Sequence, residues 1–260
     1  MISVIIPTYK EPHALDVCIN SAINGAAHKN QIIVVVDGFY DINKEVLDKY
    51  SKHIDVLNLP ENRGLNTATN FGVYNATSDK ILIANDDNVF DKDWDAKLEE
   101  IYDPNIVWAP NQIEPNPGIF KQFVVHPLGS VEDFDLVSFW DYTSTINRKE
   151  SDNCGSTLPI FMNKTKYLQV GGWDETYPGP WVVDWEFFMQ CEMSGMEMKR
   201  TYNTHFYHFV SVGTRKIEPE VTYQKGLIER ECHEYFKYKW GFYGYRNGET
   251  NSNYPPLFKQ

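Results

Sequence analysis

The feature that most constrains the fold of this chain is an alternation, in its first half, of short apolar runs with stretches of helical periodicity. The runs ISVIIP at 2–7 and QIIVVVD at 31–37 are continuous and rich in β-branched residues, which is typical of parallel strands buried on both faces. Three further strands are predicted at DVLNL (55–59), KILIA (80–84) and NIVWAP (105–110). This order predicts an α/β fold: a Rossmann-like, open, mostly parallel sheet with helices on both faces.

Helices are predicted between these strands. A stripe at helical spacing is formed by Leu15, Cys18, Ile19, Ala22 and Ile23, with Pro12 near its start. A second helix is expected after Asp41, and a third from Leu65 to Ala76. Because ligands of such sheets sit outside the carboxyl ends of the strands, the ends at Pro7–Tyr9, Asp37–Gly38 and Asp86–Asp87 are expected to converge on one crevice.

The second half predicts less regular structure. Between 111 and 150 we expect loops with short helices, because prolines and glycines from Pro110 to Gly129 break any long element. Regular structure is expected to resume with STLPIFM at 156–162. Helices are predicted from about Val183 and over 218–239, followed by an extended polar tail.

Composition excludes some classes of protein. Hydrophobic residues make up 42% of the chain, which predicts a packed core, and the net charge of -12 disfavours binding to a nucleic-acid backbone. The four cysteines lie far apart without a CxxC pair, so free thiols in a reducing compartment are expected. The start MISVIIPTYK is typical of a strand and not of a signal peptide, and no apolar run approaches the roughly 20 residues of a membrane span. These features predict a cytoplasmic protein without a transmembrane segment; peripheral membrane association and the oligomeric state are left open.

An acidic cluster follows the fourth strand, where the chain reads Asn85, Asp86, Asp87 and Asn88. Adjacent carboxylates repel each other, so a cation is expected to stabilise them. The turn after the first strand, IPTYKEP, contains no glycine, which excludes a G-x-G-x-x-G phosphate loop at that position, and a Walker A loop is absent too. A divalent Mg²⁺ or Mn²⁺ held by one or two carboxylates would neutralise a diphosphate instead.

Eight segments carry a resemblance to a known family: VIIPTYKE, VVVDG, ENRGLNTATNFGV, ANDDN, VGGWDE, VDWEF, FYHFVSVG and YFKYKWG, in this order. Together they resemble the family-two inverting glycosyltransferases with the GT-A fold. The last segment is similar to the C-terminal part of short, stand-alone members, including some encoded by large viruses and phages. Two positions depart from the family pattern. The D-x-D motif reads NDDN, and Val183 stands where the family has a glutamate before its catalytic aspartate.

The resemblance implies roles for named residues. Those that would border or bind the nucleotide are Pro7, Thr8, Tyr9, Glu11, Asp37, Asn62, Gly64, Asn66 and Asp86. Asp87 and His208 would bind Mn²⁺ or Mg²⁺, although the metal ligand within Asp86–Asp87 is uncertain by one residue, and Asp184 would be the catalytic base. The residues expected to touch the acceptor or the sugar are Trp173, Asp174, Trp181 and Glu186.

The implied organisation is one GT-A domain over 1–217, with a nucleotide-binding half at 1–110 and a smaller acceptor-binding half at 111–217. A C-terminal helix and tail, 218–260, would pack on that domain. The implied activity is a metal-dependent, inverting transfer of a hexose or pentose from a nucleoside-diphosphate sugar to a glycan or glycoconjugate hydroxyl. UDP is the favoured carrier, with GDP and dTDP open; the donor sugar and the acceptor are not specified by the sequence.

Several of these residues also have an alternative, purely structural explanation. Asp37 and the Asp86–Asp87 pair are also typical of turns, and Asp184 could cap a helix. His208 could be a core histidine, with His205 as a rival metal ligand, and the tryptophans could belong to the core. The alternative functions are a sugar nucleotidyltransferase, whose glycine-rich start is missing here, and a non-catalytic glycan- or nucleotide-binding protein on the same fold.

Overall fold

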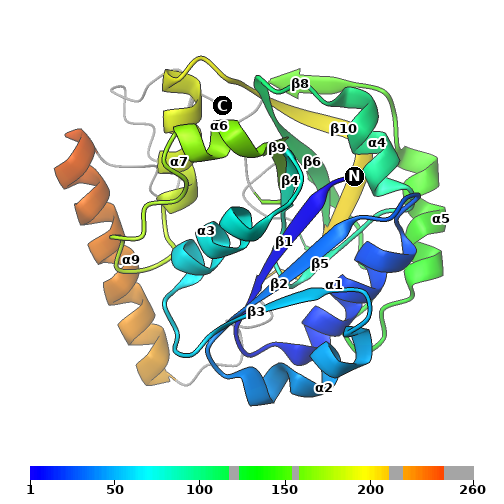
Figure 1. The fold of residues 1–260 in the computed structure, drawn as a ribbon, viewed down its shortest axis with the longest axis horizontal. Coiled ribbons are helices and arrows are strands. Elements are labelled where there is room, and N and C mark those ends of the chain that lie inside the picture. The colour runs from blue at the N-terminus through cyan, green and yellow to red at the C-terminus, as the bar shows by residue number, and fades with distance from the viewer. Residues whose placement is uncertain (117–122, 154–157, 211–218, 243–260) are drawn as a thin grey trace.

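The computed structural model describes residues 1–116, 123–153, 158–210 and 219–242. Within these ranges a ten-stranded sheet forms the centre, and its main path runs β3-β2-β1-β4-β9-β6-β10-β5 (Figure 1). The strands are β1 (Ser3–Thr8), β2 (Gln31–Asp37), β3 (Asp55–Leu59), β4 (Lys80–Ile83), β5 (Asn88–Val89), β6 (Ile106–Glu114), β7 (Val124–Val125), β8 (Ser151–Asn153), β9 (Ile160–Asn163) and β10 (Glu197–His208).

Helices cover both faces of this sheet. They are α1 (Pro12–Asn24), α2 (Tyr40–Tyr50), α3 (Leu65–Asn75), α4 (Trp94–Ile101), α5 (Leu136–Ile146), α6 (Lys164–Gln169), α7 (Val183–Met193) and α9 (Pro219–Trp240). Along β1, Ile5 packs in a cluster with α3, α6, α7 and α9, whereas Ile6 packs in a cluster with α1, α2 and α4. Successive side chains of a strand point to opposite faces, so the continuous apolar runs fill two cores.

The prediction for the first half is confirmed. The strands β3, β2, β1 and β4 pair in parallel, and their bounds agree with the apolar runs to within about a residue. The helices α1, α2 and α3 lie where the periodicity predicts them. The strands and helices of the first half can therefore be predicted from local sequence patterns alone.

The expectation that Pro110 ends a strand is wrong. Strand β6 continues through Pro110 to Glu114, because the partner strand β10 has an irregularity there: Thr201 pairs with Pro110, and the next pair is His205 with Asn111. A proline lacks the N–H that a regular ladder needs, and a bulge removes that need. The expected loops after 111 also include the 11-residue helix α5, which begins at a cap where Asp135 accepts a hydrogen bond from the Val137 N–H.

The second half adds strands of mixed direction to the sheet. Strand β9, at the end of the STLPIFM segment, runs antiparallel between β4 and β6. Strand β10 is parallel to β6 and antiparallel to the short strand β5. These pairings bring the end of β10 beside the acidic cluster that follows β4. Helices α7 and α9 begin at Val183 and Pro219, close to their predicted starts.

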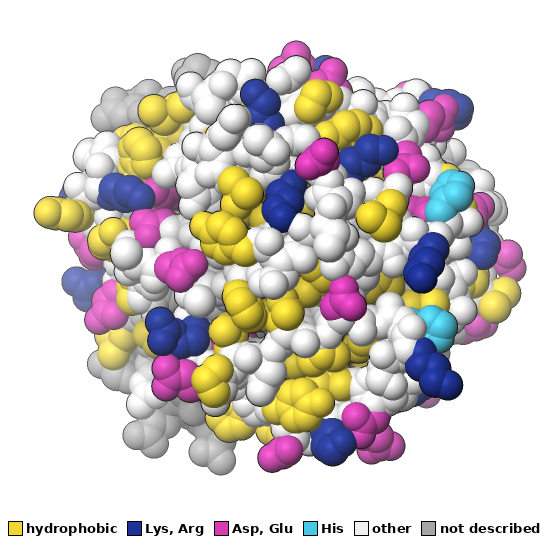
Figure 2. Space-filling view, viewed as in Figure 1, with side chains coloured by type: hydrophobic (Ala, Val, Ile, Leu, Met, Phe, Trp, Pro, Cys, Tyr) yellow, Lys and Arg dark blue, Asp and Glu magenta, His cyan; other side chains and the backbone are white. Residues whose placement is uncertain are grey.

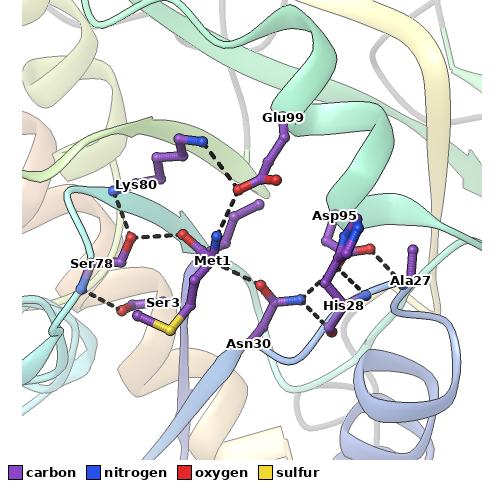
Figure 3. A network of polar contacts seen from close by, with 10 residues as sticks. Met1, Ser3, Ala27, His28, Asn30, Ser78, Lys80, Asp95 and Glu99 are labelled. Atoms are coloured by element: carbon purple, nitrogen blue, oxygen red, sulfur yellow. Dashed lines mark hydrogen bonds and ion pairs between the residues drawn. The ribbon is translucent and has the colours of Figure 1, made fainter.

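A polar network joins the amino ends of β1 and β4 to α4, at the edge opposite the carboxyl ends (Figure 3). Asp95 accepts hydrogen bonds from the backbone N–H groups of Ala27 and His28, and from Asn30 Nδ2. Asn30 Oδ1 in turn accepts from the Ile2 N–H at 2.8 Å. The network therefore lies away from the carboxyl ends of the strands, where ligands of such sheets bind.

The surface carries charges of both signs. On the face drawn in Figure 2, the coloured, described residues form no continuous basic patch, and hydrophobic side chains gather between the charged ones from the centre downwards. In the described ranges, every helix is too short or too polar to cross a bilayer. Cys18, Cys191 and Cys232 are buried and unpaired, as predicted, while Cys154 and the tail lie outside the described residues.

Candidate active site

The carboxyl ends of β1 and β4 meet through one hydrogen bond. The Thr8 hydroxyl donates to Asp86 Oδ2 at 2.7 Å, because the parallel pairing of β1 with β4 places the two strand ends side by side. Thr8 is buried and Asp86 is partly buried. Two of the predicted nucleotide-site residues thus lie in direct contact.

Asp86 lies in an environment that disfavours its charge. Burial raises the pKa of Asp86 to about 7, and the charges of Asp87 and Glu11 add to the increase against the Thr8 hydrogen bond. A divalent cation at this place would reverse that effect, since a positive charge stabilises the ionised carboxylates.

Asp87 faces a histidine from the far end of the sheet. Its Oδ1 lies 3.5 Å from His208 Nε2, and its backbone oxygen accepts from the Phe209 N–H at 3.2 Å. The antiparallel pairing of His208 with Asn88 fixes this approach. The structure therefore brings the two predicted metal ligands together.

The donor set of this pair fits a divalent metal ion. Carboxylate oxygen and imidazole nitrogen are both ligands of Mn²⁺, and a Mg²⁺ or Mn²⁺ site with few protein ligands takes phosphate oxygens and water as the others. Among the described residues no group of three His, Cys, Asp or Glu side chains is arranged to hold an ion. Asp87 and His208 would thus hold it together with a ligand.

Asp37 accepts hydrogen bonds from the loop before α3. Its two carboxylate oxygens accept from the Arg63 N–H at 2.6 Å and the Gly64 N–H at 2.9 Å, while Asn62 Oδ1 also accepts from Gly64 at 3.0 Å. Burial raises the pKa of Asp37 against the lowering effect of these hydrogen bonds. Asp37 thus orders the loop, and its contact with a base stays a prediction.

Exposed aromatic rings lie beyond the end of β1. Tyr9 and Phe39 meet edge to face with centroids 5.1 Å apart, and Lys10 Nζ lies 3.8 Å from the Phe39 centroid. The Tyr9 carbonyl accepts from Asn43 Nδ2 at 2.9 Å. Pro7 is buried in β1, so Tyr9 is the more accessible of the two predicted residues.

Asn66 on α3 reaches the segment that precedes α7. Its Nδ2 donates to the Asp174 carbonyl at 3.0 Å, and its buried Oδ1 has no hydrogen-bond partner among the residues that the structure describes. Its predicted role at the nucleotide stays a prediction, and its observed contact is structural.

Asp184 lies in the first turn of α7. The N-cap is Val182, in a left-handed conformation at φ 59°, so Asp184 is not the capping residue. Asp184 Oδ1 accepts from the Trp185 N–H at 2.9 Å, and burial raises the pKa of Asp184 to about 6. A carboxylate with a raised pKa suits proton transfer near neutral pH.

Of the predicted acceptor residues, Trp173 and Glu186 are buried, and Asp174 and Trp181 are partly buried. Trp173 is only 2% exposed and belongs to the core cluster on the α3 face, while Trp181 is partly buried against the same cluster. Asp174 accepts from the Thr176 N–H and from Lys239 Nζ, both at 2.8 Å. Trp173 thus acts here as a core residue.

Glu186 is also tied into the fold. It is 1% exposed, and its Oε1 accepts from Lys239 Nζ of α9 and from Gln190 Nε2. Its role at a sugar hydroxyl stays a prediction, while its described contacts join α7 to α9.

His205, the rival metal ligand, lies in a separate buried network. Its Nδ1 is 2.6 Å from Asn147 Oδ1, and Asn147 Nδ2 donates to the buried Asp91 at 2.7 Å. Burial lowers the pKa of His205 to about 4. These contacts support a neutral core histidine and favour His208 as the ligand.

Sequence reasoning gave no role to three residues that hold this region together: Asn70, Glu114 and Lys239. Asn70 lies inside the ENRGLNTATNFGV motif, which could have drawn attention to it. Lys239 lies inside the YFKYKWG segment, which carried no role for a lysine, whereas Glu114 lies in no motif and reaches the site only through the strand register.

Comparison with known proteins shows what the first half of the chain is similar to. The model of the family described as Glycosyl transferase family 2 matches residues 3–124. Human dolichyl-phosphate beta-glucosyltransferase is 30% identical over 125 residues, which cover 43% of this chain and 38% of that protein. Poly-beta-1,6-N-acetyl-D-glucosamine synthase of Staphylococcus aureus (strain COL) is 24% identical over 178 residues, which cover 66% of this chain and 42% of that protein. The chain thus spans about two fifths of the length of these relatives.

Two solved structures share the fold. GalNAc-T7, crystallised with UDP, GalNAc and Mn²⁺, superposes with a TM-score of 0.64 at 16% identity, covering 82% of this chain and 44% of that one. S. aureus TarS in complex with UDP gives a TM-score of 0.58 at 15% identity, covering 93% of this chain and 72% of that one. The chain therefore has the GT-A fold, and its residues 3–124 match the model of glycosyl transferase family 2.

Proposed function

We propose that this protein is a metal-dependent, inverting glycosyltransferase that moves a sugar from a nucleoside-diphosphate sugar to an acceptor hydroxyl. The single observation that carries the proposal is the approach of Asp87 Oδ1 to His208 Nε2, at 3.5 Å, beside the Thr8–Asp86 contact. It supports the proposal because the side chains proposed to bind the metal and the nucleotide lie together at the ends of β1, β4 and β10, and ligands of such sheets bind at the carboxyl ends of strands.

UDP is the proposed carrier. Both structural neighbours described above were crystallised with UDP, and one of them also with Mn²⁺. The curated relatives are named for different products, a dolichyl-phosphate glucoside and a poly-N-acetylglucosamine. The acceptor is therefore proposed only as a glycan or glycoconjugate hydroxyl.

Asp87 and His208 would hold Mn²⁺ or Mg²⁺, which when bound neutralises charge on the diphosphate. Thr8 orients Asp86 at the same edge through its 2.7 Å hydrogen bond. The loop at Arg63–Gly64, ordered by Asp37, would border the nucleoside. These residues bind and orient the donor.

Asp184 is the proposed base. The acceptor oxygen attacks the anomeric carbon as the bond from that carbon to the phosphate oxygen breaks, and the acceptor proton passes to the Asp184 carboxylate. The nucleoside diphosphate leaves with the bonding electron pair. A single displacement inverts the anomeric centre, and the raised pKa of about 6 makes Asp184 a better proton acceptor than an ordinary aspartate.

A panel of nucleotide sugars tests the proposal through release of nucleoside diphosphate, with Mn²⁺, with Mg²⁺ and with EDTA. Release should require a metal and should be lost in Asp87→Ala. Asp48→Ala is the control, because the Asp48 side chain is exposed on α2 and forms a surface ion pair with Lys44.

Thermal unfolding separates this function from its alternatives. A transferase should be stabilised by UDP only when Mn²⁺ or Mg²⁺ is present, since a ligand that binds only the folded state raises its stability. A non-catalytic glycan-binding protein should respond to sugars and ignore the nucleotide. Absence of both nucleotide release and metal-dependent stabilisation would refute the proposal.

A further inference from the structure

We infer that Glu114 is a positioning residue that orients His208 toward Asp87 and so sets the metal affinity of the site; this inference rests on the proposed function. Glu114 ends β6, which the sequence predicted to stop at Pro110. Its Oε1 lies 3.2 Å from His208 Nδ1, on the side of the ring opposite to the nitrogen that faces Asp87.

The register of the neighbouring strands β6 and β10 places Glu114 and His208 together. Strands β6 and β10 are parallel, and Asn111, Gln112 and Ile113 pair in turn with His205, Phe206 and Tyr207. Continued by one residue, this register sets Glu114 opposite His208, in agreement with the 3.2 Å contact of their side chains. Because residues paired across neighbouring strands point to the same face, the carboxylate and the imidazole lie side by side.

Glu114 is itself held in place. Its backbone pairs with Val125 of β7, and its carbonyl accepts from the His126 N–H at 3.0 Å. The residue is 7% exposed. A buried carboxylate on an anchored backbone has few orientations, so it can define the orientation of the imidazole that contacts it.

The opposite side of the ring has a different geometry. His208 Nε2 lies 3.5 Å from Asp87 Oδ1, beyond the usual range of an N–H···O hydrogen bond. When Nδ1 carries the proton and donates it to Glu114, the Nε2 lone pair points to the Asp87 side. A carboxylate behind a histidine in this way fixes the tautomer and raises the basicity of the ligating nitrogen.

A purely structural role for the pair makes a different prediction. A buried Glu–His contact could stabilise the sheet without affecting an ion, in which case its loss would change unfolding but not metal binding. Metal affinity measured on the folded protein separates the two roles.

The experiment is a Mn²⁺ titration of the full chain followed by electron paramagnetic resonance. Glu114→Ala should weaken Mn²⁺ binding about 10- to 100-fold, the usual cost of losing a partner behind a metal ligand. Glu114→Gln should lose less, because its amide oxygen still accepts the Nδ1–H bond. Glu197→Ala is the matched control: Glu197 is exposed at the other end of β10 and pairs with Lys199.

His208→Ala and Asp87→Ala separate the two proposals. If both bind Mn²⁺ as wild type does, the metal site itself is wrong and the inference falls with it. If both weaken binding but Glu114→Ala matches Glu197→Ala, the metal site stands and only the role of Glu114 is refuted.

A second readout covers the case in which Glu114→Ala does not fold. Long-range ¹H–¹⁵N spectra of the metal-free wild type, assigned with His208→Ala, report which ring nitrogen of His208 carries the proton. Protonation at Nδ1 supports the inference, and a neutral ring protonated at Nε2 overturns it.

Discussion

The side-chain amide of Asn70 holds the backbone of Trp173 from both sides: Nδ2 donates to its carbonyl at 2.8 Å, and Oδ1 accepts from its N–H at 3.0 Å. The same amide accepts from the Tyr167 hydroxyl at 2.6 Å and donates to Glu175 at 2.8 Å. Asn70 thus connects α3 to the segment that leads into α7.

Asn70→Ala should lower the free energy of unfolding by about 2–4 kcal/mol, because it leaves several buried polar groups without their partner. Chemical denaturation measures this loss. Asn75→Ala is the control on the same helix, since the Asn75 side chain is exposed and donates to the Phe71 carbonyl one turn earlier. Equal stability of the two variants would contradict the role given to Asn70.

Asp184→Asn should bind UDP with Mn²⁺ nearly as wild type does but lose transfer by about 10²- to 10⁴-fold, the usual contribution of a general base. In wild type, transfer should fall as the pH drops through about 6, where Asp184 becomes protonated. Initial rates over a pH series measure both effects. Near-wild-type turnover in the variant would show that Asp184 is not the base.

The same substitution should stabilise the fold at neutral pH. The folded-state pKa of Asp184 is raised from 3.8 to about 6, so the folded state binds this proton more tightly than the unfolded state, and stability is lost as the pH rises through that window. Asp184→Asn avoids this loss. Above pH 6, the free energy of unfolding of Asp184→Asn should exceed that of wild type by about 1–3 kcal/mol. This range follows from about 1.4 kcal/mol per pKa unit, reduced for solvent screening. The difference should vanish below about pH 4. Denaturation curves at several pH values measure this difference. A variant that is less stable than wild type above pH 6 would contradict the prediction.

Gly64→Ala should destabilise the protein by about 1–3 kcal/mol through backbone strain alone. Gly64 has φ 89° and ψ 156°, a conformation that is essentially restricted to glycine, yet an added Cβ would meet nothing within 4 Å. Gly226 in α9 also has open space around it. Gly226→Ala should therefore stabilise by about 0.5–1 kcal/mol. Because Gly64 donates to Asp37, the Gly64 variant should also bind UDP more weakly; similar stabilities of the two variants would exclude the strain argument.

The first half of the fold could be predicted from the sequence because its signals are local. Strands such as β2 and β3 coincide with the apolar runs at 31–37 and 55–59. The residues of β2 are buried on both faces of the sheet, whereas β3, at the end of the sheet, is only partly buried. The approach of Asp86 to Thr8 follows from the parallel order of the strands, without knowledge of other contacts.

The second half could not be predicted in the same way. Strand β10 carries Arg200, Thr201, Asn203, Thr204 and His205 as buried polar residues, so it shows no apolar pattern. Thr204 is satisfied by Asp91, 113 positions earlier in the chain. The irregularity opposite Pro110 likewise depends on the partner strand. Contacts between residues far apart in the sequence set the register that brings Glu114 to His208. No local motif encodes this register.

Lys239→Met should destabilise the protein by about 1–3 kcal/mol, because it leaves Glu186 buried without its cation. Lys239 Nζ contacts both Asp174 and Glu186, and the Glu186 side chain is only 1% exposed. Lys44→Met is the control, since Lys44 and Asp48 form an exposed i,i+4 pair of small energetic value.

The double variant Lys239→Met with Glu186→Gln tests the cause of that loss. If the isolated charge of Glu186 is responsible, the double variant should recover part of the stability that Lys239→Met loses, and a double-mutant cycle measures the coupling. Independent, additive effects would mean that Lys239 stabilises α9 through packing of its stem. Because Glu186 lies two positions after Asp184, the coupling energy also measures how firmly α9 holds the helix that carries the proposed base.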